Sequence, residues 1–414
     1  MLDIKLIREN KAQVEQSFLK RLNKKDFDLD TVINLDDNRR HLLLQVEKLL
    51  AQRNKASKTK PDAKTIKEMK ALGEEIKNLE EQLKKVEADL LAKLSTLPNI
   101  LADDVPAGGK ENNQIIKTFK KPPHFDFEPK NHVELATNLG LIDYQRATKM
   151  SGSGFWAYTG DGALLEWALL NYFIDFHRKH GYQFIIPPFL LNEKSAYISG
   201  HLPKFKDDLY WIEKDGLCLN ATSEMMLGNY HAEEILPAEK LPLKYFAYST
   251  CFRREAGAYR AEERGMVRGH EFNKIEMFHF AKPAESWDSF AELLKYAEEL
   301  VAGLDLHFNT VQLAAADCSA AMAKTVDLEV WIPSMKIYKE VSSVSNALEY
   351  QARRGNVRFK DKDGRNQFVH TLNASGLATS RIFPAILEQN QQKDGTVKVP
   401  KVLQKYLGKK FLGK

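Results

Sequence analysis

The sequence predicts an α+β protein that begins with a long helical hairpin. Two series of apolar residues at heptad spacing, between residues 32 and 94, predict a pair of packed helices. Residues 245–248 and 272–278 alternate apolar and polar side chains, as half-buried antiparallel strands do. From about Asn131 onward helix and strand patterns alternate, so both element types are expected in the rest of the chain.

Length and composition limit the class of protein. The 414 residues can form two or more domains with a large core, and the net charge of +5 means that any nucleic-acid surface must be local. Cys218, Cys251 and Cys318 have no CxxC spacing, which predicts reduced thiols rather than disulfides or a zinc site. The start of the chain has no apolar leader segment, and no run of about 18 apolar residues occurs. We therefore expect a soluble cytoplasmic protein without a membrane span.

The hairpin is predicted from two apolar seams joined by a short turn. Pro61, in the small polar stretch 56–62, breaks the helix between them. Arms of ~30 helical residues would be about 45 Å long and would project into solvent. The first seam consists of Val32, Leu35, Leu42, Val46 and Leu49, and the second of Met69, Leu72, Ile76, Leu79, Leu83, Val86 and Leu90.

The charge of the hairpin allows two interpretations. From Arg39 to Lys93 it carries 14 Lys/Arg against 9 Asp/Glu, an excess of +5. These residues could form a solvated coiled-coil face, or a basic tip that contacts a nucleic-acid backbone. Arg39 and Arg53 occupy seam positions where apolar residues would be more stabilising, which favours the second interpretation.

The region after the hairpin is predicted as a linker followed by a second domain. We assign residues 1–105 to the N-terminal domain, 106–130 to a linker rich in Pro, Gly and Asn, and 131–414 to the second domain. An amphipathic helix is expected from Asp161 to Gly181, with Leu164, Leu165, Ala168, Leu169, Tyr172, Phe173 and Phe176 on its apolar face. The strand 184–189 contains two prolines, which predicts an edge strand or a subunit junction.

The most charged segment, Cys251–Phe278, lies between the two alternating strands. Arg253 and Glu276 are placed on the strands near Phe272, while Gly257 and Gly265 lie in the loop. Guanidinium groups bind phosphate in a forked geometry, and aromatic rings stack on bases. The segment is either a solvated hairpin or a site for a phosphorylated planar ligand. Its arginines are Arg253, Arg254, Arg260, Arg264 and Arg268.

Three further segments carry polar groups suited to ligand binding. Residues 222–224 (Thr-Ser-Glu) follow a short strand and could hold a small polar ligand or simply cap a helix. Glu340, followed by serines on a strand, could bind Mg²⁺ or form an ordinary strand edge. Residues 369–381 are interpreted as a strand, a turn containing Gly376 and a helix, with Arg381 on its first turn.

Together these segments resemble the signature motifs of class II aminoacyl-tRNA synthetases. Residues 161–188 resemble motif 1, Phe252-Arg253-Arg254-Glu255 with Phe272 resembles motif 2, and 376–381 resembles motif 3. Residues 340–346, with the Gln-Ala-Arg-Arg of 351–354, are similar in particular to the seryl-tRNA synthetase family. Pro98-Asn99-Ile100 after the hairpin fits the same family.

The resemblance implies a fold, a reaction and partners. It implies an antiparallel sheet flanked by helices, preceded by a coiled-coil arm that binds tRNA(Ser), and a homodimer formed through motif 1. The implied reaction activates L-serine with ATP and Mg²⁺ to seryl-adenylate, then transfers the seryl group to the 3′ end of the tRNA. Neither a membrane nor zinc is implied. Whether selenocysteine tRNA is also charged, and which tRNA features are recognised, stay open.

Site residues follow from the resemblance position by position. Arg253, Glu276 and Arg381 are the implied catalytic residues, and Glu340 and Ser343 the implied Mg²⁺ ligands. Serine would be bound by Thr222, Ser223, Glu224, Glu276, Asn373 and Ser375. The nucleotide would be bound by Arg253, Arg254, Glu255, Gly269, Phe272, Glu340, Val341, Ser342, Ser343 and Arg381.

Glu271 and Gly269 are two of the positions that depart from the family pattern, and two rival functions stay possible. Glu271 replaces a usual Gln and Gly269 a bulkier residue, which puts the adenine contacts in doubt. One rival activates an amino acid for another acceptor, such as a carrier protein, but such a relative is expected to lack the basic hairpin. The other is a non-catalytic RNA-binding paralogue, which would have no need of Arg253, Glu276 and Arg381.

Overall fold

The computed structural model describes residues 1–56, 63–255 and 265–413. The chain divides into two compact units, Met1–Ile100 and Leu101–Lys414, and each is described by itself. The turn expected at 56–62 lies outside the described residues except for Ala56. Gly257, Arg260 and Arg264 of the charged loop also lie outside them.

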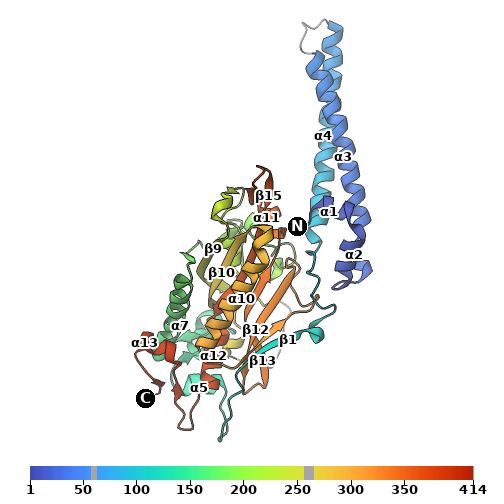
Figure 1. Cartoon of the computed structure of the whole chain (residues 1–414). Coiled ribbons are helices and arrows are strands. Elements are labelled where there is room, and N and C mark those ends of the chain that lie inside the picture. The colour runs from blue at the N-terminus through green and yellow to red at the C-terminus, as the bar shows by residue number, and fades with distance from the viewer. Residues whose placement is uncertain (57–62, 256–264, 414) are drawn as a thin grey trace. The chain divides into compact units, whose positions relative to one another are not determined.

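Two long helices that lie side by side dominate the first unit (Figure 1). They are α3 (Leu29–Ala56) and α4 (Ala63–Thr96), which confirms the predicted helical hairpin. Val32, Leu42 and Val46 of α3 are buried, as are Ile76 and Leu90 of α4, so the predicted seams form the contact. We call this pair the arm. The unit also contains α1 (Ile4–Glu9), α2 (Lys11–Leu19) and a 3₁₀ turn, Lys24–Asp26.

A buried carboxylate near the base of the arm explains one of its seam arginines. Asp36 has 0% of its side-chain surface exposed. It accepts hydrogen bonds from Arg8 Nη1 of α1 at 3.2 Å and from Arg39 Nη2 at 2.8 Å, and it pairs with Arg40 Nε at 2.9 Å. A buried charge requires such partners. Arg39 therefore has a role inside the protein, and its seam position is no longer an argument for nucleic-acid contact.

An eight-stranded sheet forms the centre of the second unit, within the ranges that the structure describes. Neighbouring strands are antiparallel, as predicted, except that the edge strand β4 (Gln183–Ile185) runs parallel to β9 (Leu243–Phe252). The strand order is β1 (Gln114–Phe119), β11 (Phe308–Gln312), β12 (Lys324–Ile332), β13 (Ile337–Asn346), β16 (His370–Ala378), β10 (Glu271–Ala281), β9 (Leu243–Phe252) and β4 (Gln183–Ile185).

The segment expected as a linker contributes a strand to this sheet. β1 lies within 106–130 and pairs with β11, so part of that segment belongs to the second unit. The Pro, Gly and Asn residues before it dominate the local composition and hide a strand of only six residues.

Helices cover one face of the sheet. α7 (Gly160–Lys179), α10 (Ser286–Gly303) and α12 (Thr379–Gln389) pack there around a core that includes Ile275 and Val344. The other helices are α5 (His132–Asn138), α6 (Tyr144–Ser151), α8 (Glu193–Ile198), α9 (Glu224–Leu227), α11 (Tyr350–Gly355) and α13 (Gln404–Leu407). Two small sheets have two strands each: β2 (Ile142–Asp143) with β3 (Ala157–Tyr158), and β17 (Val397–Lys398) with β18 (Phe411–Leu412). A three-stranded sheet has the order β5 (Leu190–Asn192), β7 (Leu217–Leu219), β6 (Trp211–Ile212). Another has the order β15 (Asn366–Phe368), β14 (Arg358–Lys360), β8 (Ile235–Leu236).

The strands β9 and β10 are more buried than their alternating sequence predicts. Every residue of β10 from Lys274 to Ala281 is buried, so the expectation of half-buried strands was wrong. A second apolar cluster, which includes Phe278, Phe280 and Val357, covers the opposite face toward one end of these strands. Lys274 and Glu276 of β10 therefore lie in a protein cavity rather than in bulk solvent.

The motif 1 segment forms the predicted helix and edge strand. α7 ends before Gly181, which has φ of +80°, and β4 lies at the sheet edge as its following prolines predict. One expectation was wrong, because Leu164 is 54% exposed instead of packed in the core. Trp167, one turn further along the same helix, is 58% exposed.

The predicted turn at Gly376 is absent, and β16 continues through it to Ala378. α12 begins directly at Thr379. A Cβ atom at residue 376 would lie 2.5 Å from His177 Nε2 of α7. The glycine is therefore needed for close packing of the helix on the strand rather than for a change in chain direction.

Every helix in the described ranges is too short or too polar to traverse a lipid bilayer.

Candidate active site

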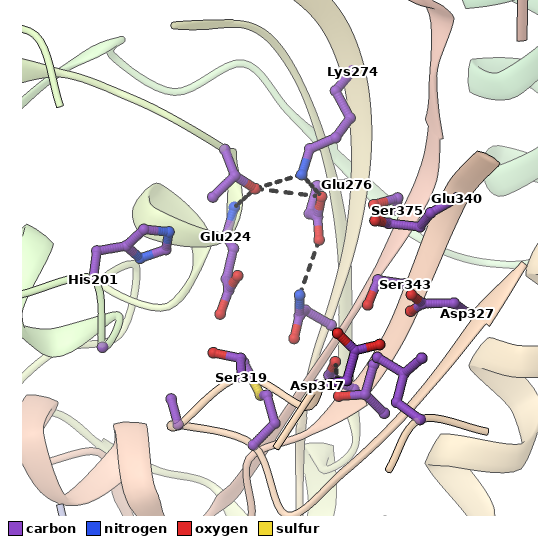
Figure 2. Close-up of a pocket in the computed structure, with 18 of the residues that line it drawn as sticks. His201, Glu224, Lys274, Glu276, Asp317, Ser319, Asp327, Glu340, Ser343 and Ser375 are labelled. Atoms are coloured by element: carbon purple, nitrogen blue, oxygen red, sulfur yellow. Dashed lines mark hydrogen bonds and ion pairs between the residues drawn. The ribbon is translucent and has the colours of Figure 1, made fainter. Parts of the chain in front are cut away.

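A cavity of about 420 Å³ opens on the face of the sheet opposite α7, α10 and α12. Strand alternation produces it, because Lys274 and Glu276 line the cavity while Ile275, between them, packs in the core. Asn373, Ser375, Ser343 and Asp327 enter from the neighbouring strands in the same way. Figure 2 shows Lys274, Glu276, Asp327, Ser343 and Ser375 around one space, from β10, β12, β13 and β16.

One end of the cavity is a small polar pocket. Lys274 Nζ donates a hydrogen bond to Thr222 Oγ1 at 2.6 Å and also pairs with the carboxylate of Glu276. Asn373 Nδ2 donates to Glu276 Oε1 at 3.1 Å. Because these groups fix Glu276 in place, the pocket is rigid and rich in hydrogen-bonding groups before any ligand enters.

Glu224 is the second carboxylate of this pocket. It lies at the start of α9, and Gln351 Nε2 donates to its Oε1 at 2.7 Å. Burial, together with the nearby charge of Glu276, raises the pKa of Glu224 to about 7. A cation bound in the pocket would offset both effects, so the site favours a positively charged group such as an ammonium.

Arg253 connects the pocket to a neighbouring cavity. It follows the end of β9, its backbone N–H donates to His270 O at 2.9 Å, and its Nε donates to Ala221 O at 3.2 Å. Its guanidinium lies over the Phe272 ring, with 5.2 Å between guanidinium carbon and ring centroid. Arg253 lines both cavities, so its guanidinium could bind a phosphate placed between them.

The neighbouring cavity is lined by most of the residues expected to bind the nucleotide. Arg381 closes one side, because its Nη1 donates to Glu340 O at 2.7 Å and its Nε to Val267 O at 3.3 Å. Glu255 pairs with Arg268 at 2.6 Å. The lining includes Arg253, Glu255, Gly269, Phe272, Glu340, Val341 and Arg381.

The two unusual residues near this cavity have different environments. A Cβ at residue 269 would lie 2.0 Å from the Trp156 ring, so only glycine fits there. Glu271 is exposed and does not line either cavity. The extra carboxylate therefore has solvent around it, and the glycine reflects packing against Trp156.

Acidic side chains gather at the far end of the main cavity. Asp327 and Glu329 of β12 lie opposite Ser343 and Glu340 of β13 in the strand register. Burial and the charge of Glu340 raise the pKa of Asp327, and burial raises the pKa of Glu329. Asp327 Oδ1 is buried without a hydrogen-bond partner among the described residues. A free buried carboxylate oxygen can serve as one ligand of a divalent cation, although no group of three or more His, Cys, Asp or Glu side chains in the described ranges is arranged to hold a metal ion.

Three residues expected in the site lie behind its walls instead. Ser223 is fully buried and shares a hydrogen bond of 2.7 Å with Ser249, and Ser342 donates to Ser375 O at 2.6 Å. Arg254 points into a separate surface depression, where its Nε donates to Leu209 O at 3.1 Å and it stacks on Tyr210. Ser223 and Ser342 support the cavity walls, whereas Arg254 lines neither cavity.

Lys274, Asp327 and His201 line the cavity although the sequence analysis did not select them. Lys274 and Asp327 had a detectable signal, because a charged residue interrupts an otherwise buried strand pattern at each position. His201 had none, since it lies in a loop between small elements. Burial and the nearby Arg253 lower the pKa of His201 to about 3, so it is neutral.

The fold and the site define a class II aminoacyl-tRNA synthetase. Residues 210–390 match the family model described as "tRNA synthetase class II core domain (G, H, P, S and T)". Residues 1–101 match the "Seryl-tRNA synthetase N-terminal domain".

Similar proteins identify the family within this class. The chain is 50% identical to Serine--tRNA ligase 2 of Clostridium acetobutylicum, covering 99% of both proteins. It is 46% identical to Serine--tRNA ligase of Petrotoga mobilis, covering 100% of both. The solved structure of seryl-tRNA synthetase from Pyrococcus horikoshii complexed with ATP matches with a TM-score of 0.93 and 34% identity, covering 100% of this chain and 99% of that one. The chain belongs to the seryl-tRNA synthetase family.

Proposed function

We propose that this protein is a serine–tRNA ligase that activates L-serine with ATP and transfers it to tRNA(Ser). The observation that carries the proposal is the rigid pocket of Thr222, Glu224 and Glu276, which Arg253 joins to a cavity suited to a nucleotide. The family relationship supports the same activity.

The small pocket is proposed to select serine. Glu224 and Glu276 would bind the ammonium group, while Thr222, Asn373 and Ser375 would surround the side chain. Alanine would leave buried polar groups without partners, which disfavours its binding strongly. Threonine would be excluded by size, because Lys274 and Asn373 already hold the walls in place.

Activation is proposed to occur beside Arg253. An oxygen of the serine carboxylate attacks the α-phosphorus of ATP, the bond from that phosphorus to the bridging oxygen breaks, and pyrophosphate leaves. Arg253 would bind the α-phosphate and the serine carboxylate, and so stabilise charge that develops in the transition state. Phe272, Glu255 and the Gly269 backbone would hold the adenine, and Arg381 would cover the terminal phosphate. Catalysis is then mainly positioning and charge stabilisation.

Glu340 and Ser343 are proposed to hold Mg²⁺, with Asp327 beside them. Mg²⁺ held by these residues would supply positive charge that offsets the charge of the phosphates. The protein's part is to present oxygen atoms from two adjacent strands, β12 and β13.

The second step and the partners follow from the proposal. A hydroxyl of the terminal tRNA ribose attacks the carbonyl carbon of seryl-adenylate, and AMP leaves. The N-terminal domain with its arm would bind the tRNA, residues 131–414 would perform the chemistry, and the protein would act in the cytoplasm.

We also propose a homodimer formed through motif 1. Leu164 and Trp167 on α7 and Ile186 after β4 are large apolar side chains that are 54%, 58% and 67% exposed. Such exposure near a sheet edge favours a protein interface. Light scattering should return the mass of two chains, and a monomer mass would contradict this assignment.

Amino-acid-dependent ATP–pyrophosphate exchange across all twenty amino acids tests the proposed function. We expect exchange with serine alone. Exchange with another amino acid, or none at all, would refute the assignment. If serine is active but tRNA(Ser) is not charged, a different acceptor such as a carrier protein becomes the better explanation.

The pKa of Glu224 predicts how serine binding depends on pH. Below about pH 7 Glu224 is protonated and attracts the ammonium weakly, so KM for serine should fall by about tenfold from pH 6 to pH 8. Initial rates of exchange at saturating ATP measure this profile. Glu224→Gln should raise KM at pH 8 and flatten the profile, and an unchanged slope in this variant would assign the titration to another group.

A further inference from the structure

We infer that Glu166 is a positioning residue that joins the three signature motifs behind the nucleotide site. The inference rests on the proposed function. Glu166 lies on α7, the helix of motif 1, and its side chain is buried on the face of the sheet opposite the cavity. It touches no residue expected to contact substrate directly, so its effect would act through the elements that it connects.

One oxygen of Glu166 accepts two hydrogen bonds from different motifs. Asn273 Nδ2 of β10 donates to Glu166 Oε1 at 2.8 Å. Thr379 Oγ1, at the first residue of α12, donates to the same oxygen at 2.6 Å. Asn273 lies between Phe272 and Lys274 in the sequence, and Thr379 lies two residues before Arg381. The carboxylate thus holds the backbone that carries the residues expected to contact ATP.

The network reaches the strand before Arg253 as well. Tyr248 Oη and Thr250 Oγ1 of β9 donate to Asn273 Oδ1 at 3.0 and 3.1 Å. Asn273 therefore uses its amide oxygen for β9 and its amide nitrogen for Glu166. Thr379 Oγ1 also lies 3.2 Å from Asn273 O, which closes the link between β10 and α12. Removal of Glu166 would leave the Asn273 amide without this acceptor and the Thr379 hydroxyl with only Asn273 O. Asn273 directly follows Phe272, and Thr379 lies two residues before Arg381.

The serine pocket is held by other contacts. Lys274 and Asn373 fix Glu276, and Gln351 fixes Glu224, without any bond to Glu166. The inference therefore predicts a selective effect, in which ATP binding is weakened more than serine binding. A residue with only a general structural role would weaken both.

Glu166→Leu removes the acceptor while keeping similar volume, and Glu166→Gln keeps an oxygen that can accept both hydrogen bonds. In serine-dependent pyrophosphate exchange we expect the Glu166→Leu variant to have a KM for ATP raised on the order of tenfold or more. Its KM for serine should change by less than about twofold. The Glu166→Gln variant should have KM values for ATP and serine near those of the wild-type enzyme. In addition, Thr379→Val should add little to the loss caused by Glu166→Leu, because both remove the same contact.

Asp175→Asn is a matched control on the same helix. Asp175 accepts a hydrogen bond of 2.7 Å from Tyr406 and lies outside this network, so its KM values should match the wild type. If Glu166→Leu raised KM for ATP and KM for serine equally, the inference would be overturned. It would also be overturned if Glu166→Leu and Glu166→Gln had equal effects. Thermal unfolding of each variant checks that it is folded. The wild-type enzyme is assayed in parallel, so that an inactive wild type refutes the proposed function and an active one with unaffected variants refutes only this inference.

Discussion

Replacement of Arg253 by alanine should lower serine-dependent pyrophosphate exchange on the order of a thousandfold. Arg253 lines both the main cavity and the nucleotide cavity, and the hydrogen bond from its Nε to Ala221 O holds its guanidinium there. Charge increases on the α-phosphate as the new bond forms, so the loss should appear mainly in kcat. Arg253→Lys should recover only part of the rate, because an ammonium cannot bind two oxygens in a forked geometry.

Arg254 provides a matched comparison for this experiment. It is the same residue type one position along, yet its side chain bonds Leu209 O and stacks on Tyr210 away from both cavities. Arg254→Ala should therefore reduce exchange far less than Arg253→Ala. Near-normal exchange by Arg253→Ala, or equal losses in the two variants, would show that Arg253 does not have the assigned role.

Removal of the outer part of the arm should reduce tRNA charging by at least about a hundredfold near 0.15 M salt and leave pyrophosphate exchange unchanged. Residues 47–72 contain 8 Lys/Arg and 3 Asp/Glu, and 8 − 3 gives a net charge of +5. Replacing this range with a short glycine linker removes parts of both α3 and α4, and leaves the buried residues Leu42 and Ile76 in the remaining helices. The remaining arm keeps its apolar contact.

Salt dependence separates a direct contact with tRNA from a folding defect. If about four of the basic side chains meet phosphates, the slope of log affinity against log salt should become shallower by about 3 to 4 in the shortened protein. A second variant, in which Gln replaces Lys64, Lys67 and Lys70, keeps the helix. Its rate of tRNA aminoacylation should also fall. Full charging by both variants would refute the proposed role of the arm.

The elements with strong periodicity were predictable from the sequence. The two seams of the arm, the helix of motif 1 and the strands β9 and β10 each bury a long, regular series of apolar side chains, which fixes their type locally. Edge position was also predictable for β4, because prolines follow it. β1 was not predicted, because it lies in a region of linker composition, has only six residues, and is mostly exposed.

The candidate site was partly predictable for a different reason. Residues such as Arg253, Glu276 and Glu340 were found because charges on strands and the family resemblance both marked them. Ser223, Ser342 and Arg254 shared those marks, yet strand alternation and local bonds turn them away from the cavity. Gly376 shows the same limit, because the contact that requires a glycine comes from His177, 199 residues earlier in the sequence.

The sequence alone determined the class of fold, the arm, the family and most of the residues that meet in the cavity. The tertiary structure decided which side chains share a space, because strand pairing brings Lys274, Asp327 and Asn373 together from distant positions. It also decided the protonation of Glu224, since a pKa depends on burial and on neighbouring charges. Local pattern specifies an element and its inner face, whereas contacts between elements are set only when the strands pair and the helices pack on them.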